Sequence, residues 1–321
     1  MNLTMAQVLA SSKRIASIAT RTPLKPSLSL SNDLGRPVSL KMETLQATGA
    51  FKLRGATNAI LSLSDEARSR GVVTASSGNH GRAVAYVAKA LGIPASICLS
   101  DLVPQSKVEA IRRLGADVHV GGKDQDAAMD VAHNIESTQG MSFISPFDNI
   151  DVIRGQATMG FEIIEDNPDV DTIVVPVSGG GLAAGVGFAV KTLKPDVKII
   201  GVTMEHGASM YHSLAAGKPV NVEEVSTIAD ALQGGIGLDN VYSFDLCREF
   251  VDEVMLISDT QIMAAMTYAY RNEHLVLEGS GASGIGLLLD ERANAFGDNI
   301  VTICSGDNID PDTFMAVVSG S

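Results

Sequence analysis

The sequence predicts an α/β protein with two lobes, each with a mainly parallel, twisted sheet covered by helices. From about residue 70 onward, short β-rich runs alternate with helical patterns, and the strand-like runs are apolar at consecutive positions. Parallel strands joined by helices are buried on both faces and read in this way. The chain has 321 residues, whereas one domain typically has roughly 100 to 200. Two lobes are therefore expected.

The expected strands and helices follow one another in pairs along the chain. A strand that feeds a helix and then a second strand is typical of parallel sheets. No repeat of fixed short period and no low-complexity tail interrupts this order. The expected strands lie at 71–76, 95–100, 117–120, 172–177, 197–202, 254–258 and 299–305, and the helices between them at 81–92, 105–115, 124–137, 181–194, 207–217 and 259–274.

Two segments interrupt this order and predict where the chain passes between the lobes. Pro, Asp and Asn cluster in SPFDNIDVIRGQ at 145–156, and no strand follows directly. The earlier segment, LSLSDEARSRG at 61–71, is acidic and rich in Ser. We therefore expect a large domain made of residues 1–64 and 147–321, and a small mobile domain made of residues 65–146.

Composition excludes several classes of partner. The net charge of −13, from 24 basic and 37 acidic residues, argues against a nucleic-acid or anionic membrane surface. No apolar run reaches the ~18 residues of a membrane span, and the polar and apolar residues that alternate at the N-terminus do not resemble a signal peptide. We expect a cytoplasmic protein whose cysteines, Cys98, Cys247 and Cys304, are reduced, and whose partner is a small molecule.

The segment TGAFKLRGA at 48–56 places Lys52 in an unusual setting. Its neighbours include Ala50, Phe51, Leu53 and Gly55. A lone lysine is usually a surface residue, but small and apolar neighbours indicate partial desolvation here. Burial lowers a lysine pKa, and a neutral amine is a nucleophile that forms a Schiff base with an aldehyde.

Two segments that follow expected strands can bind anions. SSGNHG at 76–81 lies between a strand and a helix, where ligands collect in parallel sheets, although Ser, Gly and Asn also form ordinary turns. SGGGLAAG at 178–185 follows TIVVPV, and three consecutive glycines cost conformational entropy that a plain turn rarely requires. Its backbone N–H groups can surround a phosphate at a helix start.

Two further segments have more than one reading. EGSGASG at 278–284 matches the dinucleotide pattern G-x-G-x-x-G, but the chain after it has room for only one more strand, so NAD binding is not expected. CSGDN at 304–308 ends the last expected strand. Its Ser305 either begins a turn or offers a hydroxyl to a ring nitrogen.

Together, these motifs and their order resemble the fold-type II pyridoxal-phosphate enzymes, in the branch of serine/threonine dehydratases, serine racemase and 3-hydroxyaspartate dehydratases. The resemblance runs from RTPL at 21–24 through AFKLRGA, SSGNHG, GQATMGFEI, SGGGL and EGSGA to CSGDN. It implies a tryptophan synthase beta-like fold, pyridoxal phosphate as the cofactor of the large domain, and a homodimer.

The resemblance also implies a role for each matching residue. Lys52 carries the cofactor as a Schiff base and moves the Cα proton, and Ser77 is the acid or base on the opposite face. Asn79 binds the phenolic oxygen of the cofactor, and Ser305 faces its pyridine nitrogen. The remaining contacts to phosphate and ring are expected from Phe51, Ser178, Gly179, Gly180, Gly181, Leu182 and Glu278, and those to the substrate carboxylate from Ser76, Ser77, Gly78 and His80.

The implied reaction is β-elimination of water from a 3-hydroxyamino acid, which yields a keto acid and ammonia. Arg154 stands where the family usually has a small residue, and a guanidinium can bind a carboxylate with two hydrogen bonds. This makes 3-hydroxyaspartate the leading expected substrate, ahead of threonine or serine dehydration and serine racemisation. A salt bridge from Arg154 to Asp148 or Asp151 is the alternative.

Other departures and rival readings remain open. Some members of the branch bind a divalent cation such as Mg²⁺ through two acids, but here Glu205 has no second acid in the segment that follows it. Asp307 stands where a second glycine is usual. β-Replacement on the same fold, or a two-lobed protein that binds a phosphate ligand without catalysis, are the competing functions.

Overall fold

The consecutive apolar residues of the expected strands are buried in two sheets of the computed structural model, which describes residues 3–320. The larger sheet has the strand order β1-β2-β10-β7-β8-β9, and only β1 is antiparallel to its neighbour. Its strands are β1 (Leu24–Pro26), β2 (Val38–Met42), β7 (Thr172–Pro176), β8 (Lys198–Met204), β9 (Glu253–Ile257) and β10 (Ile300–Cys304).

The smaller sheet is entirely parallel, with the order β5-β4-β3-β6. All seven strands expected from the sequence are present, and the α/β class is confirmed. The sheet contains β3 (Val72–Ala75), β4 (Ala95–Leu99), β5 (Asp117–Val120) and β6 (Ser142–Phe143). The division into domains at 64/65 and 146/147 stays a prediction.

Helices cover both faces of the larger sheet because its strands are apolar on both sides. Along β7, Ile173 and Val175 pack with the helices α8, α9 and α11, whereas Val174 packs with α12, α13 and α14. Successive side chains of a strand point to opposite faces, so one strand serves two cores. These helices are α8 (Ile150–Asp166), α9 (Gly181–Leu193), α11 (Ser243–Phe250), α12 (Asp259–Tyr268), α13 (Gly279–Leu288) and α14 (Pro311–Ser319).

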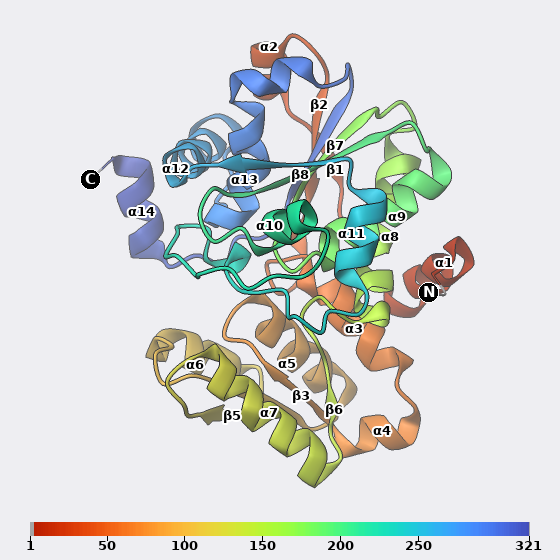
Figure 1. Cartoon of the computed structure of the whole chain (residues 1–321), viewed down its shortest axis with the longest axis vertical. Coiled ribbons are helices and arrows are strands. Elements are labelled where there is room, and N and C mark those ends of the chain that lie inside the picture. The colour runs from red at the N-terminus through yellow and green to blue at the C-terminus, as the bar shows by residue number, and fades with distance from the viewer. Residues whose placement is uncertain (1–2, 321) are drawn as a thin grey trace.

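The smaller sheet is also covered on both faces. Val72 packs in a core with residues of α5 and α6, whereas Val73 and Ala75 pack against α7. In Figure 1 this sheet and its helices occupy the lower part of the view, and the larger sheet lies above. The helices are α4 (Asp65–Arg70), α5 (Asn79–Leu91), α6 (Gln105–Arg113) and α7 (Gln125–Gln139).

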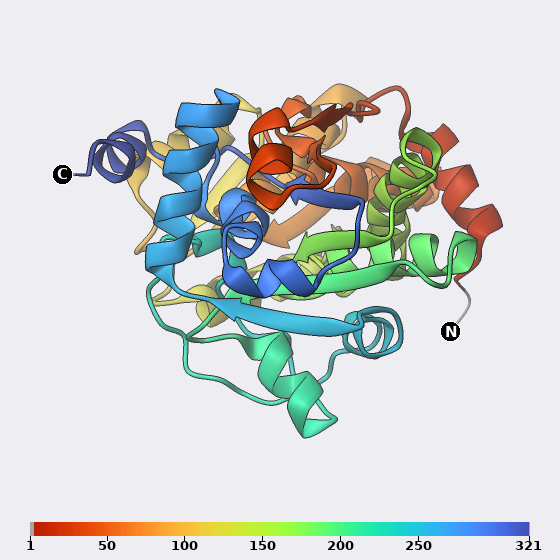
Figure 2. The same cartoon turned by 90° about the horizontal axis from the view of Figure 1, so that it is seen from above.

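Among the described residues four helices remain, and one of them, α3, packs in the core of the smaller sheet. In Figure 2, α1 and α14 lie on opposite sides of the molecule. Within residues 3–320, none of the helices combines the length and apolar character that a membrane crossing requires. They are α1 (Met5–Ile15), α2 (Leu28–Leu34), α3 (Lys52–Ser62) and α10 (Ser209–Ala216), with short 3₁₀ turns at Glu43–Leu45, Asp230–Leu232 and Glu291–Ala295 and a π turn at Ala269–Glu273.

Among the helices of residues 3–320, α5 and α9 are the two that have a glycine as their N-cap residue. Helices such as α4 and α7 begin with a Ser or Asp whose side chain accepts from a backbone N–H, whereas α5 and α9 begin at Gly78 and Gly180 with no side-chain cap. The first N–H groups of a helix lack intrahelical partners. Both helices follow parallel strands, β3 and β7, so they offer donors where these sheets bind ligands.

Candidate active site

Lys52 is the first residue of α3 and lies where several chain segments converge. Its Nζ donates to the carbonyl oxygen of Pro146 at 2.7 Å and lies 5.2 Å from the ring centre of Phe51. The backbone N–H of Phe51 donates to the carbonyl oxygen of Ser305 at 3.0 Å, and Ala50 forms a β-bridge with Gly306. The end of β10 therefore holds the segment that presents Lys52.

The Lys52 amine is desolvated without a direct acidic partner. Burial lowers its pKa to about 8, although the charge of Glu278 acts in the opposite direction. Among the ion pairs of residues 3–320 there is none to Lys52. A lower pKa increases the neutral fraction of the amine at neutral pH by roughly two orders of magnitude. The lowered pKa agrees with the desolvation expected from the sequence, and the role of Lys52 stays a prediction.

The glycines of SGGGL form a close contact that larger residues would prevent. Gly180 has φ of +89°, a conformation that L-residues rarely adopt, and it precedes the first turn of α9. A Cβ on Gly179 would lie 2.3 Å from the ring of Phe147. The loop therefore keeps its backbone N–H groups close to Phe147, which follows the Pro146 that binds Lys52.

The loop from Ser76 to Gly78 leads into α5 by a tight turn. A Cβ on Gly81 would lie 2.0 Å from the carbonyl oxygen of Ser76, so a glycine is required there. Ser76, Ser77 and Gly78 are only partly buried. The loop precedes an uncapped helix start, which is suited to a carboxylate. Their individual roles stay predictions.

His80 is buried, and its ring is held as a neutral group. Burial and the charge of Lys52 lower its pKa to about 3. Because its Nε2 lies 2.9 Å from the carbonyl oxygen of Ile144, that nitrogen carries the proton and donates. Nδ1 is then an acceptor and cannot bind a carboxylate. Any carboxylate contact from His80 must come from its backbone N–H.

A hydrogen bond joins Asn79, the first residue of α5 beside the smaller sheet, to Glu278, which precedes α13 beside the larger sheet. The Asn79 amide donates to Oε1 of Glu278 at 2.7 Å, and it accepts a hydrogen bond from Asn308 at 2.7 Å. Burial, with the nearby charge of Asp230, raises the Glu278 pKa to about 7. The sequence analysis assigned Asn79 and Glu278 to the same cofactor but did not predict a contact between them. Asn308 was missed, although it lies in the polar CSGDN segment.

The residues present fit a ring-shaped ligand with a phosphate. Within residues 3–320, several buried polar atoms of these segments have no hydrogen-bond partner, among them Thr48 Oγ1, His80 Nδ1 and Ser280 Oγ. Unsatisfied buried polar atoms are costly and are characteristic of ligand sites. Together with the desolvated Lys52 amine and the glycine loop, these atoms form a donor and acceptor set that pyridoxal phosphate can satisfy.

Two predicted site residues have other partners. Arg154 Nη1 pairs with Asp151 Oδ1 at 2.8 Å on the same helix, which is the alternative that the sequence analysis left open. Glu205 follows β8, is exposed, and lies 3.4 Å from His206. Among the described residues, no group of three or more His, Cys, Asp or Glu side chains is placed to hold a metal ion. Glu205 is therefore not part of such a group.

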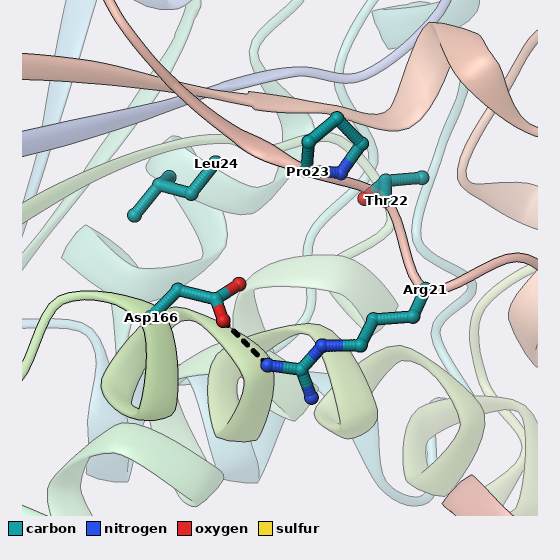
Figure 3. Close-up of a pocket in the computed structure, with 5 residues that line it drawn as sticks. All are labelled: Arg21, Thr22, Pro23, Leu24 and Asp166. Carbon is teal, nitrogen blue, oxygen red and sulfur yellow. Dashed lines mark hydrogen bonds and ion pairs between the residues drawn. The ribbon is translucent and has the colours of Figure 1, made fainter.

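A surface pocket lies apart from these segments. Figure 3 shows Arg21, Thr22, Pro23, Leu24 and Asp166 around it, with the Arg21 guanidinium paired to Asp166. Asp166 precedes β7, whereas the glycine loop follows that strand. None of the residues assigned to the candidate site lines this pocket, and its one cation, Arg21, is already paired with Glu165 and Asp166.

Comparison with known proteins decides the family. Residues 15–306 match the family described as pyridoxal-phosphate dependent enzyme. The chain belongs to this family. Its fold and site place it in the fold-type II group, in the branch of threonine dehydratase, serine racemase and hydroxyaspartate ammonia-lyase. The cofactor implied by the family is pyridoxal phosphate, as the sequence predicted.

Three relatives define the similarity within this branch. A putative threonine dehydratase of Sinorhizobium fredii is 49% identical, over 99% of this chain and 96% of the relative. The L-threo-3-hydroxyaspartate ammonia-lyase of Saccharomyces cerevisiae is 35% identical, over 99% and 97%. The structure of maize serine racemase matches with a TM-score of 0.93 and 34% identity, over 100% of this chain and 98% of the other.

Proposed function

We propose that this chain is a pyridoxal-phosphate dependent ammonia-lyase that removes water and ammonia from threonine or serine. The observation that carries the proposal is Lys52. Its desolvated amine donates to Pro146, next to the Phe147 that packs on the glycine loop, and its charge acts on His80 in the first turn of α5. The 49% identity to a putative threonine dehydratase supports an uncharged hydroxyamino acid over 3-hydroxyaspartate, the leading substrate of the sequence analysis. Threonine and serine therefore move ahead of it.

Named residues would hold the cofactor at the carboxyl ends of the strands. The N–H groups of Gly181 and Leu182, in the first turn of α9, suit its phosphate. Ser305 would face the ring nitrogen, and Asn79 would donate to the phenolic oxygen. The remaining contacts are assigned to Phe51, Ser178, Gly179, Gly180 and Glu278.

The bound cofactor would supply an electron sink for the negative charge that develops on Cα. Lys52 removes the Cα proton, because its neutral amine is a base with a pKa near the working pH. A hydroxyl, unlike a carboxylate, does not fix a full positive charge on a ring nitrogen. Ser305 therefore favours elimination over transamination.

The substrate is held by the start of α5. Its uncapped N–H groups, beyond Gly78, would donate to the substrate carboxylate, which the partial positive charge of the helix start also attracts. Ser76 and Ser77 would close over it, and Ser77 is the candidate acid or base on the face opposite Lys52. His80 contributes through its backbone, because its ring donates to Ile144.

Substrate profiling of the purified protein tests the proposal. Serine, threonine and each stereoisomer of 3-hydroxyaspartate are supplied with pyridoxal phosphate, and keto acid and ammonia are measured. We expect both products from threonine or serine, and borohydride reduction should label Lys52. A colourless protein that borohydride does not label, and that releases no ammonia, would overturn the assignment. Product formation only with sulfide present would indicate β-replacement instead.

A second candidate, 3-hydroxyaspartate dehydration, rests on Arg154. Its guanidinium is largely buried and paired with Asp151, so it would have to share that charge with a second substrate carboxylate. Replacing Arg154 with Ala should then lower kcat/KM for hydroxyaspartate far more than for serine. Equal losses for both substrates would leave Arg154 with the structural role of its ion pair.

A further inference from the structure

Four polar side chains form a continuous series of hydrogen bonds between α5 and two segments beside the larger sheet. Arg82 Nη1 donates to Asn308 Oδ1 at 2.5 Å, and Asn308 Nδ2 donates to Asn79 Oδ1 at 2.7 Å. Asn79 Nδ2 then donates to Glu278 Oε1 at 2.7 Å. We call these residues, Arg82, Asn308, Asn79 and Glu278, the amide relay.

The relay has a fixed direction because its first member can only donate. A guanidinium has no acceptor, so the Asn308 oxygen must face Arg82 and the Asn308 NH₂ group must face Asn79. The same NH₂ group also donates to the carbonyl oxygen of Thr48 at 2.8 Å. Asn308 is thus fixed at both ends of its amide.

The orientation of Asn308 determines the orientation of Asn79. The Asn79 oxygen accepts from Asn308, so its NH₂ group faces Glu278, the buried acid that is assigned to the cofactor site. An amide turned by 180° would present an acceptor there instead. A carbonyl oxygen cannot donate to the phenolic oxygen of a cofactor, so the direction of the relay decides whether Asn79 can act.

Neighbouring charges support this arrangement. Asp307, next to Asn308, is partly buried, and the charge of Arg82 acts on its carboxyl group. A Cβ on Gly306, the residue before Asp307, would lie 2.5 Å from Glu278 Oε1, and the charge of Asp307 also acts on Glu278. The relay therefore runs from a cation to a carboxyl group, and each hydrogen bond polarises the next one in the same sense.

We propose that Asn308 is a positioning residue that holds the Asn79 amide with its donor toward the cofactor, and that Arg82 and the Thr48 carbonyl anchor Asn308. This rests on the proposed function for the identity of the ligand, but the relay itself is a property of the protein alone. Asn308 touches no reacting atom. It acts through Asn79, which lies 229 residues away in the sequence.

The decisive variant is Asn308→Asp, which keeps the shape of the side chain. Its carboxylate still accepts from Arg82, but it cannot donate to Thr48 or to Asn79. In this variant the Asn79 NH₂ group is expected to turn toward the new carboxylate, and the Asn79 oxygen toward Glu278. Arg82→Lys is the matched control, because an ammonium remains a donor to Asn308.

The holoenzyme is measured by absorbance, by cofactor dissociation and by kinetics. We expect Asn308→Asp to lower the ratio of long- to short-wavelength cofactor absorbance and to weaken cofactor binding by about tenfold, the upper range for one hydrogen bond. Arg82→Lys should retain the wild-type spectrum. If the wild-type protein is active and Asn308→Asp leaves both its spectrum and its cofactor affinity unchanged, the proposal is wrong.

The cofactor-free protein provides a second measurement that does not depend on the proposed function. Thermal midpoints of Asn79→Ala, Asn308→Asp and the double variant form a mutant cycle. Coupled residues should give a double variant less destabilised than the sum of the single effects. Additive effects would overturn the relay, whereas a coupled cycle in a protein that fails to bind pyridoxal phosphate would refute the proposed function only.

Discussion

Lys52 and Arg54 are two residues apart on α3. Arg54 is buried and Lys52 is half-buried, yet the pKa of Arg54 is raised and that of Lys52 is lowered. Arg54 is 1% exposed and pairs with Glu43 at 2.8 Å and with Glu162 at 2.7 Å, and these carboxylates raise its pKa. Lys52 has a carbonyl oxygen as its closest partner, and its pKa falls to about 8. The presence of a carboxylate, rather than burial alone, separates a structural cation from a reactive amine.

The Arg54 side of α3 is a closed network. Lys41 pairs with Glu162 at 2.6 Å and donates to the Thr22 carbonyl, and Arg54 also approaches Thr158. Two cations and two carboxylates therefore balance each other within the core. The network joins β2, α3 and α8 behind the reactive end of the helix.

The largest expected effect comes from removing the reactive amine. Lys52→Ala should lower kcat/KM by at least about a thousandfold, because both the cofactor attachment and the base are lost. Steady-state ammonia release measures the loss. The same variant should be folded and no less stable without cofactor, since a desolvated ammonium is removed. A marked fall in the thermal midpoint would contradict the view that the desolvated Lys52 ammonium destabilises the folded protein.

Removing Arg54, the structural cation, should lower the stability of the folded protein. Arg54→Met leaves Glu43 and part of Glu162 without their partner in the core and should destabilise the protein by about 3–5 kcal/mol. Urea unfolding of the cofactor-free protein measures this. Adding Glu43→Gln to the variant should recover part of the loss, because an uncompensated carboxylate is neutralised. If Glu43→Gln recovers no stability, the loss in Arg54→Met comes from packing and not from the unpaired carboxylate.

Glu278 offers a test with a defined pH dependence. Its folded pKa of about 7 exceeds the ordinary value of 4.5, so the folded state binds more protons between these values and stability falls as pH rises through them. Glu278→Gln should therefore stabilise the cofactor-free protein by up to about 3 kcal/mol above pH 7. The gain should disappear below pH 4.5. Melting curves from pH 4 to 8 measure it, and a pH-independent difference would contradict this account.

The smallest effect is expected at the exposed pair between Lys107 and Asp230, 3.0 Å apart. Lys107 is on α6 beside the smaller sheet, whereas Asp230 is in the 3₁₀ turn near Glu278. Lys107→Met should change stability by less than about 1 kcal/mol, because water screens both groups. Urea unfolding in low and high salt checks this, and a loss above that range would show an unexpectedly strong link between the sheets.

The sequence alone predicted the features that depend on neighbours along the chain. Apolar runs placed β3 and β7, and Ser and Gly after them placed the two helix starts. β2 was missed because its VSLKM sequence contains Lys41, and a lysine is rarely buried. Lys41 is buried here because it pairs with Glu162, which is 121 residues away in the sequence. β6 has two residues, too few for a pattern.

Contacts between distant segments account for most of what the sequence did not predict in the site. Lys52 was singled out correctly from its apolar neighbours, but its partner Pro146 is 94 residues away. The ion pair of Arg154 could be considered because Asp151 is one helical turn away. Asn308 and Arg82 are 226 residues apart, and no local pattern reports that they meet.

The short crossing segment from Pro146 to Asp148 has a consequence for how this enzyme can change. The Pro146 carbonyl oxygen accepts a hydrogen bond from the Lys52 amine, and Phe147 packs against the glycine loop. The Asp148 carboxylate accepts hydrogen bonds from the backbone N–H groups of Val241, Tyr242 and Ser243 at 2.7 to 2.9 Å. Three consecutive residues thus serve three separate parts of the molecule. A designer who reshapes the pocket through this stretch must alter several partners together, so single substitutions here are poor starting points for new specificity.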